Sequence, residues 1–265
     1  PELTLNGQKV KNVQSHVESI GSYVNIPRFS AQLGKGNISF KGDTNLENGV
    51  IDGILEVNHA QLAHLLPVLN VTDSGVDGRL DGVVRIGGEV GVPSLDLYGR
   101  LQDGLLRGYP LEAADIHVSQ IGSLITIHRF EAKQGVNGKL VAQGTADLRG
   151  EYQLEVGGTN LDAGLLTTWF FPKLPAKGSL DFVAQLSGPA DKPFVNLSIG
   201  VSKGVLGGVS FDSATALLLI DQKKIEVEQA ALTSGQYRAR VRGAVPVAAL
   251  RGDGADGPMD LRLDL

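Results

Sequence analysis

The sequence of 265 residues contains no cysteine, one tryptophan and one methionine, and only 5% of its residues are aromatic. The absence of cysteine excludes disulfides, thiolate metal sites and a cysteine nucleophile. The shortage of aromatic residues beside 35 glycines predicts many tight turns and a core of valine, isoleucine, leucine and alanine. Narrow β-sheets fit that composition better than a thick globule.

Basic charge and long apolar runs are missing as well. The formal net charge of −5 gives no basic surface for phosphate groups, so nucleic acid is not an expected partner. No run of about 18 apolar residues occurs, so we expect no membrane-spanning helix. Because the sequence begins without a methionine or a signal peptide, we expect a segment of a longer protein whose anchor lies outside it.

Motifs for catalysis and for metal or cofactor binding are not found. The histidines occur in neither HExxH nor HxH spacing, and there is no GxSxG or GxxxxGK[ST] motif. Asp81 and Asp181 recur 100 residues apart, on the polar side of alternating segments, where we expect them to be solvated. We therefore predict a protein that is not an enzyme and that has no metal site and no cofactor. The histidines are His16, His59, His64, His117 and His128.

A repeat of about 100 residues organises the chain. The segment from Gly78 to Gly108 recurs from Gly178 to Gly208, and Gly88, Pro93 and Gly104 have counterparts at the same offset. The repeat predicts a partial unit at 1–77, a full unit at 78–177 and a truncated unit at 178–265, joined in one elongated domain.

The repeated segments alternate apolar and polar residues between glycine and proline turns, which is typical of half-buried antiparallel strands. Helical spacing interrupts the pattern at residues 60–69 and in AGLLTTWFF, where Asp162 is a candidate helix cap. We predict an all-β fold: about twenty strands in a long antiparallel sheet, curled lengthwise into an open trough. A closed trough with a dry core remains the alternative.

The pattern GxLxGxxxxxG…PxLxGxLxxxxGxLxG in both copies, followed by GxLxxxGxxxL at 138–148, resembles the TamB branch of the AsmA-like envelope proteins, a translocation-and-assembly and bridge-like lipid-transfer family. The resemblance implies a β-taco fold with a hydrophobic groove in the periplasm of a diderm bacterium, anchored in the inner membrane. It also implies phospholipid transport between inner and outer membrane. The other function it implies is outer-membrane β-barrel protein assembly and secretion with an Omp85-class partner.

The predicted trough would hold phospholipid acyl chains on its apolar floor, and alternation alone selects the residues of that floor. A bulge would invert a strand, and the inward register of residues 124–130 stays open. The predicted lipid-groove residues are Leu80, Val84, Ile86, Leu95, Leu97, Leu101, Ile116, Val118, Leu140, Ala142, Leu148, Leu154, Val156, Leu180, Phe182, Leu186, Val195, Leu197, Ile199, Tyr237, Ala239 and Val241.

Overall fold

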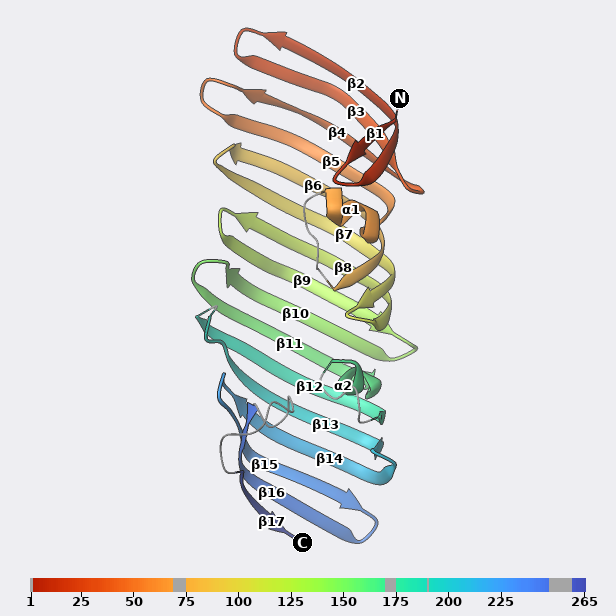
Figure 1. The fold of residues 1–265 in the computed structure, drawn as a ribbon, viewed down its shortest axis with the longest axis vertical. Coiled ribbons are helices and arrows are strands. Elements are labelled where there is room, and N and C mark those ends of the chain that lie inside the picture. The colour runs from red at the N-terminus through yellow and green to blue at the C-terminus, as the bar shows by residue number, and fades with distance from the viewer. Residues whose placement is uncertain (1, 69–74, 170–174, 190, 248–258) are drawn as a thin grey trace. The chain divides into compact units, whose positions relative to one another are not determined.

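A computed structural model describes residues 2–68, 75–169, 175–189, 191–247 and 259–265. Within the described residues the fold is all-β: 17 strands follow one another in an antiparallel meander sheet, with the short helices α1 and α2 between strands (Figure 1). The prediction of a long antiparallel sheet is confirmed, although its strands are fewer and longer than expected. The chain divides into two compact units, Pro1–Ala132 and Lys133–Leu265, with the boundary inside a strand.

Unit 1 contains the first helix and the strands up to that boundary, and each strand pairs with the next one along the chain. The elements are β1 (Leu3–Leu5), β2 (Gln8–Ile20), β3 (Tyr23–Leu33), β4 (Gly36–Asn45), β5 (Val50–Gln61), α1 (Leu62–Val68), β6 (Val76–Glu89), β7 (Val92–Leu106), β8 (Tyr109–Ile121) and β9 (Leu124–Gln134), which crosses the boundary.

Unit 2 repeats this plan with its own helix. Its elements are β10 (Gly138–Asp147), β11 (Glu151–Asp162), α2 (Gly164–Trp169), β12 (Ala176–Pro189), β13 (Phe194–Leu206), β14 (Val209–Ile220), β15 (Lys224–Ser234), β16 (Tyr237–Pro246) and β17 (Asp260–Asp264). Among the described residues, no pairing joins the first and last strands of either unit, so neither unit is a closed barrel.

Both predicted helices form where expected, and they are short. Pro67 lies in the last turn of α1. The Asp162 carboxylate accepts a 2.6 Å hydrogen bond from the backbone amide of Gly164, which confirms the predicted cap. Leu69 and Phe170, at the ends of the two predicted helical segments, lie outside the described residues. In the part of the chain that the structure describes, no helix is long and apolar enough to cross a membrane.

The strands are interrupted by β-bulges, at which two residues oppose one on the neighbouring strand. In β5, Asn58 and His59 face Asp81, because the register steps from Val57 to Ala60. Unit 2 repeats this bulge in β11, between Gly158 and Leu161. In β3, Ile26 and Phe29 face one side of the sheet although three positions separate them, because Pro27 and Arg28 form a bulge. Bulges keep apolar residues on one face where simple alternation would not.

Candidate binding face

In unit 2, the strand register places apolar residues in continuous rows on one side of the sheet, which we call the apolar face. Ala142 pairs with Val156, Val156 with Ala184, Ala184 with Leu197, and the same row continues through β14 to β17. Four such rows contain only apolar residues or glycine. They are Leu161, Leu180, Val201, Ala214, Leu232 and Ala239; Leu140, Gly158, Phe182, Ile199, Ala216, Ala230, Val241 and Leu263; Ala142, Val156, Ala184, Leu197, Leu218, Val227, Gly243 and Leu261; and Gly144, Leu154, Leu186, Val195, Ile220, Ile225 and Val245.

Unit 1 has an apolar face of the same kind, with one polar residue, Gln120, at the end of a row. Its rows are Ala60, Leu80, Leu101 and Ala114; Ala31, Ile38, Val57, Gly82, Gly99 and Ile116; Phe29, Phe40, Leu55, Val84, Leu97 and Val118; and Ile26, Gly42, Gly53, Ile86, Leu95 and Gln120. The opposite side of the same strands is mainly polar, so the period-two pattern does separate the two faces.

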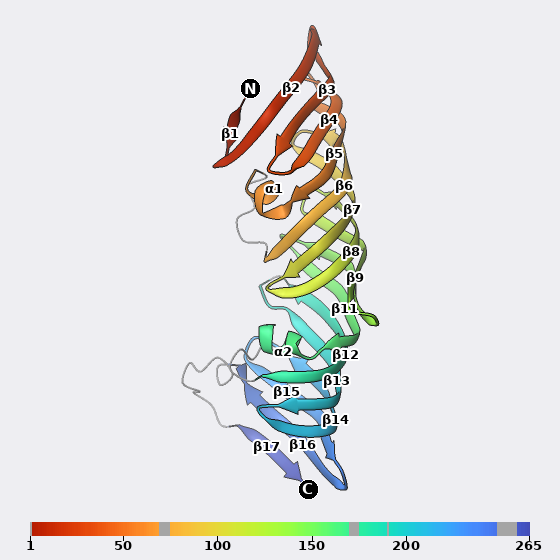
Figure 2. The same cartoon turned by 90° about the vertical axis from the view of Figure 1, so that its right-hand side faces the viewer.

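The apolar face of unit 1 is covered at one end and open over the rest. The covered row includes Ala60, Leu80 and Leu101, which are 0%, 7% and 2% exposed. Helix α1 contacts β5 and β6 there, and Figure 2 shows it on one side of the sheet. Val84 and Leu97, farther along the same strands, are only half-buried. Burial also extends into the next row, where Ala31 and Val57 are 4% and 2% exposed, and the two rows farther from α1 stay partly accessible.

Helix α1 is fixed by the hairpin of β1 and β2. The side-chain amide of Asn6 donates to the carbonyl of Pro67 at 3.1 Å, and His64 Nδ1 lies 2.9 Å from Gln8 Oε1. The ring of His64 also covers the turn at Gly34, where an added Cβ would lie 2.8 Å from His64 Cδ2. These contacts close the helix end of the apolar face. In unit 2, Ala163 directly before α2 and Leu165 within α2 are likewise buried.

All but two of the predicted lipid-groove residues lie on the apolar faces. Leu148 lies in the turn after β10 and is 58% exposed, so it belongs to no row. Tyr237 is the first residue of β16 and is 74% exposed. The others lie within the rows given above, and their role in holding lipid stays a prediction.

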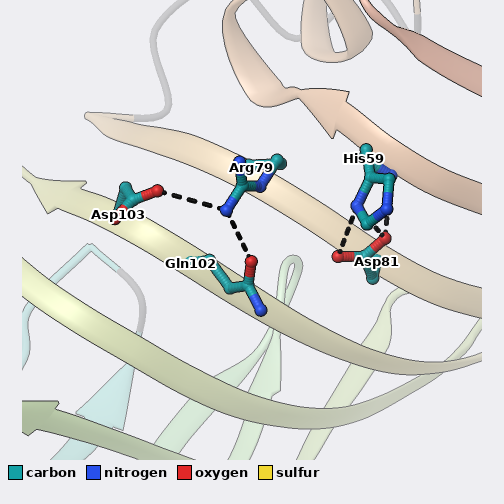
Figure 3. A network of polar contacts seen from close by, with 5 residues as sticks. All are labelled: His59, Arg79, Asp81, Gln102 and Asp103. Carbon is teal, nitrogen blue, oxygen red and sulfur yellow. Dashed lines mark hydrogen bonds and ion pairs between the residues drawn. The ribbon is translucent and has the colours of Figure 1, made fainter.

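The bulge in β5 is held by a polar network on the other side of the sheet (Figure 3). His59 has a positive φ of 54°, and its backbone amide donates a 2.8 Å hydrogen bond to Asp81 Oδ1. Its ring Nδ1 lies 3.1 Å from Asp81 Oδ2. Beside it, the Arg79 guanidinium donates to Gln102 Oε1 at 2.7 Å and to Asp103 Oδ2 at 3.3 Å.

Unit 2 repeats the backbone part of this network with different side chains. Asn160 has φ 49°, and its amide donates to Asp181 Oδ1 at 3.0 Å. Ser179 donates to Asn160 Oδ1 at 3.3 Å, where unit 1 has the arginine. Asp81 and Asp181 lie on the polar face as expected, and each carboxylate also holds a left-handed residue of a bulge, which the sequence analysis did not predict. The recurrence of an aspartate at positions 81 and 181 was the sequence signal for this shared role.

An open cleft of about 580 Å³ lies beside this second bulge. Its polar wall is already paired within the protein: Gln134 Oε1 accepts from the amide of Asp162, and Ser179 bonds Asn160. The cleft lining includes Gln134, Asn137, Asn160, Asp162 and Ser179.

A stack of rings lies on the polar face of unit 1. Tyr98 and His117 stack with centroids 4.0 Å apart, and His117 and His128 with centroids 4.3 Å apart. His117 Nε2 lies 3.0 Å from Asp96 Oδ1, whereas Ser119 Oγ contacts His128 Nε2 at 2.7 Å. The serine and the aspartate therefore contact different imidazoles. No group of three histidine, aspartate or glutamate residues within the described ranges is arranged to hold a metal ion.

Comparison with family models, with curated proteins and with solved structures found no match to the chain.

Proposed function

We propose that the apolar faces bind the acyl chains of phospholipid and that this segment conducts lipid across the periplasm between the inner and outer membranes. One observation carries the proposal: in unit 2, two rows of apolar residues and glycine run across all strands from β10 to β17, and most of these residues are only half-buried. Contiguous exposed apolar surface in a folded protein is typical of an interaction site.

The size of the face in unit 2 suits an extended alkyl chain. Rows two residues apart are separated by about 6.6 Å, and neighbouring strands by about 4.8 Å. Four rows across seven strands therefore cover a surface of about 20 Å by 29 Å. Moving a sixteen-carbon chain into water costs about 12 kcal/mol, because each methylene contributes about 0.8 kcal/mol. A continuous apolar surface would remove most of that cost.

The proposal needs the sheet of each unit to form an open trough. The bulges at His59 and Asn160 support this shape, because a bulge bends its strand and increases the local twist. An open trough lets the head group stay in water while the chain lies against the floor. Transport along such a floor requires no catalytic group and no charged recognition residue.

The experiment compares lipid bound to wild-type protein with lipid bound to two variants of β13. Leu197→Asp places a charge on the apolar face, whereas Ser198→Asp, its neighbour, places the same charge on the opposite, exposed face. Each protein is equilibrated with phospholipid vesicles, reisolated and extracted, and bound lipid is quantified by mass spectrometry. We expect Leu197→Asp to lose at least tenfold and Ser198→Asp to match wild type. Equal lipid in both variants, with circular dichroism showing both folded, would refute the proposal.

A further inference from the structure

The edge of unit 1 opposite α1, which we call the helix-free edge, consists of the hairpin turns at 20–23, 46–50, 89–92 and 121–124 (Figure 1). Every turn carries exposed apolar side chains. Ile20 is 83% exposed and Leu46 66%. The exposed apolar residues of this edge are Ile20, Tyr23, Leu46, Val50, Val90, Val92, Ile121 and Leu124.

These turns are joined to one another. The amide of Leu46 donates to the carbonyl of Ser22 at 2.8 Å, and the amide of Val90 donates to the carbonyl of Gly49 at 2.7 Å. A Cβ on Gly122 would lie 3.3 Å from the side chain of Val92. The exposed aliphatic residues therefore form a continuous, ordered border that adjoins the open rows of the apolar face. At the other edge of unit 1, the turns Asn6-Gly7 and Gly34-Lys35 are polar, and the exposed apolar residues beside its turns are fewer, with Leu5 at 40% and Leu105 at 42%.

The charge of the helix-free edge has one sign. All charged residues in 18–25, 43–52, 87–94 and 119–126 are acidic, namely Glu18, Asp43, Glu47, Asp52 and Glu89. Asp43 and Asp52 are direct cross-strand partners, and like charges in that relationship destabilise a sheet. Glu18 contacts His16 and Asn25, and Asp43 bonds Tyr23. An apolar border with an excess of negative charge is complementary to an amphiphile that carries a cation.

We propose that lipid enters the apolar face of unit 1 over the helix-free edge, and that this edge favours phospholipids whose head group carries an ammonium group over lipids with a net negative charge. The inference rests on the proposed function and adds the side of entry and the class of head group. Entry at the other edge is opposed by α1. Contacts with β2, β5 and β6 hold this helix over the covered row.

The test uses vesicles with equal amounts of ethanolamine-headed and glycerol-headed phospholipids of identical acyl chains. The full chain is incubated with them and reisolated, and both bound lipids are quantified. Wild type should hold about fivefold more of the ethanolamine lipid at low salt, because several exposed charge pairs add small gains, and the ratio should fall as salt is raised.

A triple variant tests the role of the charge, namely Glu47→Gln/Asp52→Asn/Glu89→Gln. It should bring the ratio of bound ethanolamine lipid to bound glycerol lipid near one, without reducing the total amount of bound lipid. The control triple variant Glu112→Gln/Glu151→Gln/Glu228→Gln removes the same charge from exposed positions outside these four turns and should keep the wild-type ratio. If wild type binds the two lipids in equal amounts, or binds more of the glycerol lipid, this inference is overturned while the proposed function stands. Wild type that binds neither lipid would overturn both.

Side entry is tested by uptake rate. The double variant Leu46→Ser/Val90→Ser should slow lipid uptake severalfold without changing the final amount of lipid bound. The matched pair Leu5→Ser/Leu105→Ser, exposed beside turns at the other edge of unit 1, should keep the wild-type rate. Equal rates for both pairs would contradict entry over the helix-free edge.

Discussion

The backbone amide of His59 is held by the carboxylate of Asp81 across a bulge, with 2.8 Å between nitrogen and oxygen. Asn160 and Asp181 repeat this bond at 3.0 Å in unit 2. Since a bulge leaves one residue outside the ladder, its amide needs another acceptor. The carboxylate supplies that acceptor and fixes the position at which the strand bends.

Replacing the acceptor should loosen the bulge. We expect Asp181→Ala to destabilise unit 2 by about 1 kcal/mol, since a hydrogen bond to an exposed charged group contributes about that much. Asp181→Asn should keep most of this stability, because the side-chain amide oxygen of asparagine can still accept the hydrogen bond. Hydrogen exchange at the amide of Asn160 and a urea unfolding midpoint measure the effect. Exchange that is unchanged in Asp181→Ala, with Glu151→Ala as the surface control, would show that the bond does not hold the bulge.

A further bulge lies in β13, where Lys203 and Gly204 oppose Gly178 of β12, and Lys203 is strained there. Its φ of 50° is in the left-handed region, which costs a non-glycine residue about 1 kcal/mol. Its side chain is exposed. We therefore expect Lys203→Gly to raise the thermal unfolding midpoint by relieving that strain. Lys177→Gly, at an exposed strand position without a positive φ, should lower the midpoint. The same sign for both substitutions would contradict the strain assignment.

His64 should matter more than other surface histidines. It joins α1 to Gln8 in β2 and covers Gly34. We expect His64→Ala to cost about 1 kcal/mol and to speed hydrogen exchange in 8–10 and 62–66, because it removes a hydrogen bond and leaves a gap over the turn. His16→Ala, at an exposed position, should leave exchange there unchanged. Protection equal to wild type in His64→Ala would mean that α1 is held by other contacts.

The turn between β14 and β15 should respond to acid. Hydrogen bonds from the backbone amides of Lys224 and Lys223 hold the pKa of Asp221 below its usual value. A lowered folded-state pKa stabilises the fold above the unfolded pKa of about 3.9, and this stabilisation is lost as pH falls through the lower folded value. Asp221→Ala should therefore be less stable than wild type at neutral pH, with a difference that shrinks below about pH 4. Urea midpoints from pH 7 to pH 2 measure this difference, and a constant difference would refute the linkage.

The sheet and most members of its apolar face were predictable because the side-chain period of a strand is two, as the row through Val84 and Leu97 illustrates. Bulges were not predictable in the same way. Ile26 and Phe29 share a face only because Pro27 and Arg28 oppose a single residue, and alternation alone does not mark that step. Leu148 was misplaced because alternation continued into a turn.

The roles of polar residues were the least predictable part. Asp81 is separated from His59 by 22 positions, and only the strand register brings them together. The acidic and apolar composition of the helix-free edge likewise arises from turns distant in sequence, which the meander aligns.

The most direct test of the account is the lipid content of Leu97→Asp/Leu197→Asp beside that of Tyr98→Asp/Ser198→Asp. Both pairs add two charges to the same two strands, and only the first pair adds them to the apolar faces. After equilibration with phospholipid vesicles, mass spectrometry of organic extracts should find lipid in wild type and in the second pair. The first pair should hold less than a tenth of that amount. Equal lipid in the two folded variants would contradict the account.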